Sequence, residues 1–189
     1  MLEIRKAKRE EIDEVIMLSD YVFRELSGYQ PTMGQQFPTL LSRDNADSIY
    51  VALSDGKIVS IICTVLNDAI IYGHKVSMAS LGSVCTHPDY QGKGIGTKLL
   101  KYTFDDLYDK KVGIITISGD RGLYKRNKAV SQGNEYRYEF ETAVLPEADI
   151  KGIAFDYISD GDSTGRLSKV YLKEPVRYSR SEKDFPILI

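Results

Sequence analysis

The sequence predicts a mixed α/β fold, in which a central mixed β-sheet is flanked by helices and followed by a C-terminal extension. An apolar run ending at Cys85 passes through a glycine-rich loop into a helical pattern, Ile95 to Tyr108, whose apolar residues recur at helical spacings. A further apolar run, Val112 to Ser118, follows that helix and is rich in β-branched residues. Strand, helix and strand in this order predict two parallel strands joined by a right-handed crossover.

Composition excludes several classes of protein. The chain has 189 residues, of which 42% are hydrophobic, so it is long enough for one well-filled core. A net charge of −2 does not indicate binding to nucleic acid or to an anionic membrane, because proteins that bind these partners typically carry an excess of positive charge. No apolar run approaches the roughly 20 residues of a membrane helix, and the N-terminus is charged from Glu3 onward, unlike a secretory signal. Cys63 and Cys85 lie in apolar runs, which favours buried free thiols and a cytoplasmic location, and no ligand spacing indicates a metal site.

The N-terminal part predicts a strand, a helix and a loop. Residues 2–7 alternate between apolar and charged side chains, which is typical of a strand with one polar face. Helical spacing then runs from Ile12 to Phe23, with acidic residues in the first turn, and Gly28 is expected to end this helix. The following Gly- and Pro-containing stretch predicts a surface loop with a short helix near Gln35–Leu41.

Three strands are predicted in the middle of the chain. Residues 49–53 form the first, and an Asp-Gly turn at 54–57 leads into the second at 58–66. The second strand is nearly all apolar and is therefore expected to be buried on both faces. Lys75 to Cys85 supplies the central strand that precedes the glycine-rich loop.

The C-terminal part is less regular. A break at residues 118–122 precedes a short predicted helix at 123–127, and Tyr136 to Val144 alternates as a closing strand would. Residues 149–189 form the expected extension, with a polar, turn-forming cluster at 159–165. The chain ends on an apolar run, Phe185 to Ile189, so the extension is expected to dock on the core or on a partner subunit, as in a homodimer, or to begin a second module.

The glycine-rich loop has the features of an anion site. Gly92, Gly94 and Gly96 alternate where the predicted helix begins. The first N–H groups of a helix have no intrahelical partner and its dipole is positive there, so a phosphate can bind to the backbone. Glycine permits the tight turn and the close approach of an anion. Lys93 and Lys98 add positive charge.

The spacing of the residues in this loop distinguishes between the kinds of phosphate-binding loop. A Walker A loop requires Ser or Thr after Gly-Lys, but Gly94 follows Lys93 here. A dinucleotide-binding fingerprint requires a third glycine at a spacing that this loop lacks, and Pro88 bends the chain between strand and loop. A glycine turn that merely joins a strand to a helix is the remaining structural alternative.

The run Gln91 to Gly96 reads Q-x-x-G-x-G and follows V-x-x-H-P-x-Y at Val84 to Tyr90. In these residues the chain resembles the GCN5-related N-acetyltransferase (GNAT) superfamily, which holds the pyrophosphate of acetyl-CoA on [RQ]-x-x-G-x-[GA] between its fourth strand and third helix. The resemblance implies a GNAT-type acyl-CoA N-acyltransferase fold over residues 1–148, with acetyl-CoA as cosubstrate. It further implies cofactor-binding positions at the strand end (Val84, Cys85 and Thr86) and along the loop (Gln91, Gly92, Lys93, Gly94, Ile95, Gly96 and Thr97).

The resemblance also implies a general acid. The family commonly carries F-Y-x-x-x-G-F after its fifth strand, and Leu123-Tyr124 keeps the apolar-Tyr pair, so Tyr124 is the candidate that protonates the leaving sulfur. Lys128-Ala129 stands where Gly-Phe is usual, and the asparagine that often starts the motif is missing. The alternative is that Tyr124 packs in the core. No general base is identified, and Asp68, Glu25 and a water chain remain open.

Together these features predict an acetyl-CoA-dependent N-acetyltransferase that transfers an acetyl group directly to a primary amine. A non-catalytic acyl-CoA-binding regulatory module is the alternative that the altered tyrosine motif favours, and a structural or assembly domain is the one that the apolar end favours. The acceptor, a small-molecule or peptide amine, is not determined, because the fold and the cofactor loop serve many substrates.

Overall fold

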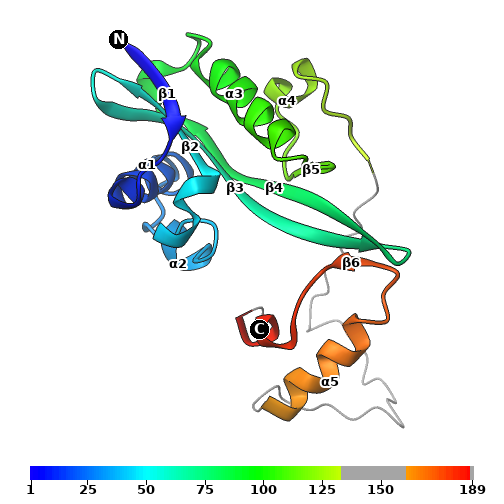
Figure 1. Cartoon of the computed structure of the whole chain (residues 1–189). Helices are drawn as coiled ribbons and strands as arrows, with labels where there is room; N and C mark the ends of the chain where they lie inside the picture. The colour runs from blue at the N-terminus through cyan, green and yellow to red at the C-terminus, as the bar shows by residue number, and fades with distance from the viewer. Residues whose placement is uncertain (133–160, 188–189) are drawn as a thin grey trace, which may run out of the picture. The chain divides into compact units, whose positions relative to one another are not determined.

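The structure is a computed structural model that describes residues 1–132 and 161–187 (Figure 1). The chain divides into two compact units, residues 1–128 with 175–179 and residues 129–174 with 180–189. The predicted closing strand at Tyr136–Val144 lies outside the described residues.

The larger unit is built on a six-stranded mixed sheet with the strand order β1-β2-β3-β4-β5, and β6 pairs with β3. All neighbouring strands are antiparallel except β4 and β5, which are parallel. The mixed sheet and the parallel pair are therefore confirmed. The strands are β1 (Leu2–Lys6), β2 (Ile49–Ser54), β3 (Lys57–Ile71), β4 (His74–Thr86), β5 (Ile114–Ile117) and β6 (Val176–Tyr178).

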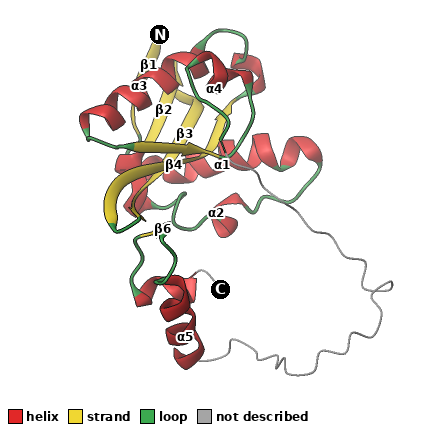
Figure 2. Cartoon of the chain, turned by 90° about the vertical axis from the view of Figure 1, so that its right-hand side faces the viewer, coloured by secondary structure: helices red, strands yellow, loops and turns green. Residues whose placement is uncertain are grey.

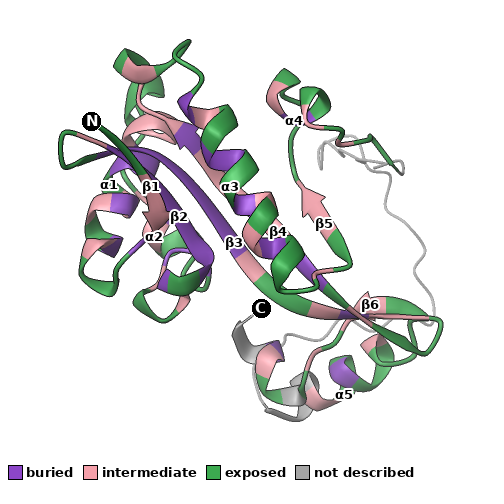
Figure 3. Cartoon of the chain, turned by 45° about the horizontal axis from the view of Figure 1, so that its top comes forward, coloured by how far each residue is buried: buried purple, intermediate pink, exposed green. Residues whose placement is uncertain are grey.

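Helices cover both faces of this sheet. In Figures 1 and 2, α1 and α2 lie against one face and α3 against the other. The core between α1 and the sheet is formed by apolar side chains that are less than a tenth exposed, including Val15, Val51 and Ile61. The burial of β3 is continuous from Ile58 to Thr64, as its apolar sequence predicts, but Leu66, at the end of the predicted buried strand, is 39% exposed (Figure 3). The helices are α1 (Ile12–Phe23), α2 (Met33–Gln36), α3 (Ile95–Asp109) and α4 (Gly122–Arg126).

Two predicted helix boundaries are wrong in the segment after α1. The helix ends at Phe23, and Gly28, at φ +77°, closes a separate 3-10 turn. The short helix lies at Met33–Gln36 instead of Gln35–Leu41, because the residue before Pro38 is disfavoured in helical conformation and Phe37 has ψ +58°. The buried Asp20 carboxylate accepts the N–H of Met33 at 2.8 Å and so fixes the start of α2.

The smaller unit contains α5 (Gly161–Tyr171). The polar cluster that was predicted as a turn therefore begins a helix over its described part, since Asp, Ser and Thr also favour helix starts. Phe185 is 7% exposed, and its ring packs edge-on against Tyr171 with centroids 5.4 Å apart. In the described part of the chain, no helix has both the length and the hydropathy needed to cross a bilayer.

Candidate functional site

The site begins at a bulge in the middle of the sheet. On β3, Ile61 pairs with Cys85 and Cys63 pairs with Gly82, so β4 has two residues opposite one of β3. One of these two, Ser83, has φ +47°, a conformation that non-glycine residues seldom adopt. Its hydroxyl lies 2.5 Å from that of Ser19 on α1, and this contact fixes the bulge to the helix. A β-bulge of this kind bends the strand and redirects its side chains.

The neighbouring strand separates from β4 at the same level. Pairing between β4 and β5 runs from Met78 and Ile114 to Leu81 and Ile117, and no described pair follows it. Two cavities lie beyond this point, and both are lined by Val84 and Arg121. The bulge and the separation of the strands together open the sheet at the end of β4.

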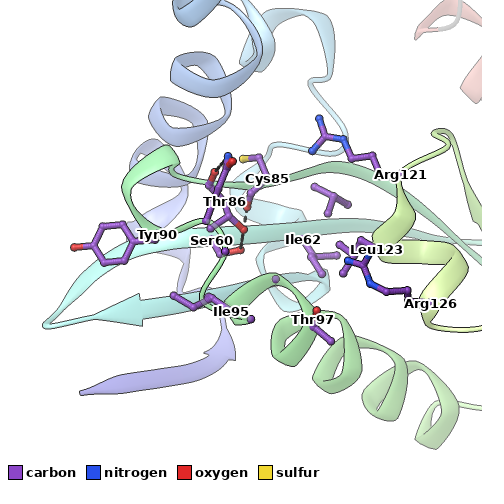
Figure 4. Close-up of a pocket in the computed structure, with 15 residues that line it drawn as sticks. Ser60, Ile62, Cys85, Thr86, Tyr90, Ile95, Thr97, Arg121, Leu123 and Arg126 are labelled. Atoms are coloured by element: carbon purple, nitrogen blue, oxygen red, sulfur yellow. Dashed lines mark hydrogen bonds between the residues drawn. The ribbon is translucent and has the colours of Figure 1, made fainter.

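The first cavity, here called the glycine-loop cavity, has a volume of about 440 Å³. Gly92 and Gly94 adopt φ +74° and +73°, a left-handed conformation that favours glycine. Gly94 is also the N-cap of α3. Because glycine has no side chain that could accept a hydrogen bond, the first N–H groups of the helix have no side-chain cap. The lining residues are Ser60, Ile62, Val84, Cys85, Thr86, Tyr90, Gln91, Gly92, Gly94, Ile95, Gly96, Thr97, Arg121, Leu123 and Arg126 (Figure 4).

Hydrogen bonds hold the strand end beside the loop. Ser60 donates to the Cys85 carbonyl at 3.0 Å, and its hydroxyl lies 2.8 Å from that of Thr86 (Figure 4). The Gln91 amide donates to the Thr86 carbonyl at 2.9 Å. A Cβ on Gly96 would lie 3.4 Å from the Thr86 hydroxyl, so the start of α3 approaches the strand closely. The structure thus brings the sequence-predicted strand and loop positions, except Lys93, to one cavity.

Lys93 is the one predicted loop residue that does not line this cavity. Its ammonium donates to the Asp89 carbonyl at 2.8 Å and lies 5.0 Å from the centroid of the Tyr90 ring. The His87 ring stacks on Tyr21 and accepts the N–H of Asp89, consistent with a role in shaping the turn. Lys93 therefore stabilises the turn before the loop.

The second cavity, here called the tyrosine cavity, has a volume of about 200 Å³. Tyr124, on α4, is 6% exposed, and burial raises the pKa of its hydroxyl, while the positive charge of Arg121 acts in the opposite direction. Among the described residues, none forms a hydrogen bond with this hydroxyl. The lining residues are Phe23, Met33, Phe37, Leu40, Leu81, Gly82, Ser83, Val84, Ser118, Gly119, Arg121 and Tyr124.

The backbone at the end of α4 is left-handed at the position where the family motif has glycine. Lys128 stands at that position of the motif and has φ +67°. A left-handed residue after the C-cap is a common helix end, and a side chain there costs about 1–2 kcal/mol. The lysine side chain at this position therefore strains the turn.

We expect Lys128→Gly to stabilise the protein by up to about 1 kcal/mol, because relief of the strain exceeds the added entropy of the unfolded chain. Thermal unfolding measures the effect. Lys128→Ala is the matched control, since it removes the same side chain but keeps the strained Cβ. Equal melting temperatures for the glycine and alanine variants would show that a side chain at position 128 does not strain the turn.

Sequence reasoning missed the two arginines of the site. Arg121 lines both cavities and Arg126 lines the glycine-loop cavity, and no motif marks either of them. The two sequence-level candidates for a general base lie elsewhere. Asp68 forms an ion pair with Lys75 at 2.7 Å, and neither it nor Glu25 lines either of these two cavities.

This arrangement favours particular chemistry. Uncapped amides at a helix start beside an arginine suit a phosphate group, and a buried neutral phenol suits proton donation. Burial raises the pKa of the Cys85 thiol to about 12, so that thiol is protonated at neutral pH and is no nucleophile. Within the described ranges, no cluster of side chains is suited to hold a metal ion.

Comparisons with known proteins agree with the fold. A family profile described as an acetyltransferase (GNAT) domain matches residues 3–127. Among curated protein sequences, none matches the chain significantly.

Solved structures of acetyltransferases share the architecture. A GNAT family acetyltransferase from Brucella melitensis, solved with acetyl-CoA, is 25% identical, with a TM-score of 0.56 over 67% of this chain and 81% of its own. A predicted acetyltransferase from Clostridium acetobutylicum, also solved with acetyl-CoA, is 16% identical, with a TM-score of 0.60 over 74% of this chain and 96% of its own. A probable N-acyltransferase from Enterococcus faecalis is 21% identical, with a TM-score of 0.56 over 67% of this chain, but only 31% of that longer protein is covered.

Proposed function

Because the chain belongs to the GNAT acetyltransferase family, we propose that it transfers an acetyl group from acetyl-CoA directly to a primary amine. The observation that carries the proposal is the uncapped start of α3, which faces a cavity beside the bulged end of β4. Acetyl-CoA is present in the Brucella and Clostridium structures and is the cosubstrate of this family.

The glycine-loop cavity fits the phosphate-bearing part of acetyl-CoA. The amides from Gly92 to Thr97 supply donors, three of them on glycines that place no side chain in the way, and Arg126 adds a positive charge to the same cavity. Val84, Cys85 and Thr86 offer main-chain groups at the bulge, where the pantetheine arm and the acetyl carbonyl would bind. Most of these contacts are to the backbone, so the path of the chain matters more than side-chain identity.

The reaction transfers one acyl group, and two proton transfers accompany it: one proton leaves the amine and one is taken up by the sulfur. The neutral amine nitrogen bonds to the thioester carbonyl carbon, the carbon–sulfur bond breaks, and the nitrogen releases a proton to water. The sulfur leaves as a thiolate and takes a proton. In our proposal Tyr124 supplies that proton and regains one from water, because the residue is buried, its phenol is neutral, and its hydroxyl has no partner among the described residues.

Calorimetric titration of the purified chain with acetyl-CoA tests the donor half of this proposal. We expect saturable binding, and we expect thiol release when amines are added, measured with a thiol reagent. Binding without thiol release for any amine would favour the non-catalytic acyl-CoA-binding module, which the altered motif around Tyr124 also suits. Absence of binding would overturn both functions.

A further inference from the structure

The walls of the tyrosine cavity are largely apolar. Phe23 comes from the end of α1, and Met33, Phe37 and Leu40 come from α2 and the turn after it. Leu81 contributes from β4 and is 3% exposed. Such walls favour an acceptor with an aliphatic or aromatic group over one covered with hydroxyl groups, because buried hydroxyls without partners are costly.

The cavity carries one charged side chain among the residues described. Arg121 lines it, and the guanidinium carbon lies 5.9 Å from the centroid of the Phe23 ring. Figure 4 shows this side chain extending away from Arg126, toward the side of the sheet on which α1 lies. In the described part of the chain, no carboxylate forms an ion pair with Arg121. The guanidinium is therefore free to pair with a ligand.

Size and charge together disfavour polycationic acceptors. A volume of about 200 Å³ is below the roughly 300–1,000 Å³ of sites for drug-sized ligands, so a small acceptor fits best. A polyamine or an aminoglycoside needs carboxylates to compensate its ammonium groups, and none lines the described walls. Like charge with Arg121 disfavours such acceptors further.

We propose that the acceptor is the α-amino group of a small apolar amino acid, whose carboxylate pairs with Arg121 and whose side chain packs against Phe23 and Met33. This inference rests on the proposed acetyltransferase function. A guanidinium binds a carboxylate through two parallel hydrogen bonds, which orients the α-carbon as well as holding it.

The same surroundings prepare the amine for attack. The apolar walls disfavour an ammonium ion, so they lower the pKa of the bound amine, while the guanidinium compensates the charge of the carboxylate. The proton leaves to water, and the neutral nitrogen then bonds to the acetyl carbon. This accounts for a cavity whose described walls hold no general base.

The test compares matched acceptors by thiol release from acetyl-CoA. L-Leucine and L-phenylalanine are compared with their methyl esters, with 3-methylbutylamine and phenethylamine, which lack the carboxylate, and with spermidine. We expect kcat/KM for the amino acids to exceed that for the esters and amines by about tenfold or more. Arg121→Gln should remove this advantage by raising KM for the amino acids much more than for the esters and amines, which lack the carboxylate that Arg121 would bind. Arg43→Gln is the matched control, since Arg43 is exposed and lines neither cavity.

The outcomes separate this inference from the function beneath it. Turnover with spermidine or the simple amines at rates equal to the amino acids would overturn the inference and leave the acetyltransferase intact. Acetyl-CoA binding without turnover of any amino acid would also overturn it. Failure to bind acetyl-CoA at all would instead remove the proposed function.

Discussion

Gly94→Glu is expected to abolish acetyl-CoA binding, with affinity reduced by at least about a hundredfold. Gly94 is the N-cap of α3 and has φ +73°, so a side chain there strains the turn. The new carboxylate would compete for the helix amides that the pyrophosphate needs, and it would repel phosphate. Both effects act on the same few atoms, which is why the expected loss is large.

A second glycine provides a matched control for strain and charge. Gly73 lies in the turn between β3 and β4 at φ +84°, with nothing within 4 Å of an added Cβ, and it lines neither cavity. Gly73→Glu should therefore bind acetyl-CoA like the unaltered chain in calorimetry. Retained binding by Gly94→Glu, or equal losses in both variants, would contradict a phosphate site at the loop.

The sequence predicted those parts of the fold that depend on local pattern. The glycine alternation before Ile95 and the helical spacing after it define a strand–loop–helix unit, and the structure has that unit with β4 and β5 parallel. The burial of Cys63 and Cys85 was also predicted from the sequence, because both residues lie in apolar runs. These features need no knowledge of distant neighbours.

Features that depend on pairing across the sheet were not predicted. To predict the bulge at Ser83, one would need to know the register between β3 and β4. The positive φ of this serine is not indicated by any sequence feature other than the preceding Gly82. Arg121 gains its importance only because the separation of β4 and β5 opens cavities beside it. The start of α5 was missed for a local reason, since the residues that favour helix caps also favour turns.

Tyr124→Phe is expected to lower kcat by roughly a hundredfold while the affinity for acetyl-CoA changes little. The substitution removes only the hydroxyl, and Tyr124 does not line the glycine-loop cavity, so binding of the phosphate groups should be preserved. Tyr108→Phe is the control, because Tyr108 is 75% exposed on α3 and lines neither cavity. Unaltered turnover in Tyr124→Phe would show that the tyrosine serves packing alone.

The pH dependence of turnover separates proton donation from packing. Burial raises the pKa of Tyr124 above its usual value of 10.0, and the phenol donates only while it is protonated. The active form is therefore present below the raised pKa and is lost as pH rises through it. We expect kcat to be maintained beyond pH 10 and to fall only above that, and we expect this fall to be absent from the residual activity of Tyr124→Phe. If Tyr124 were purely structural, any loss of kcat in Tyr124→Phe would be the same at every pH, and the variant would keep the alkaline limb of the unaltered chain.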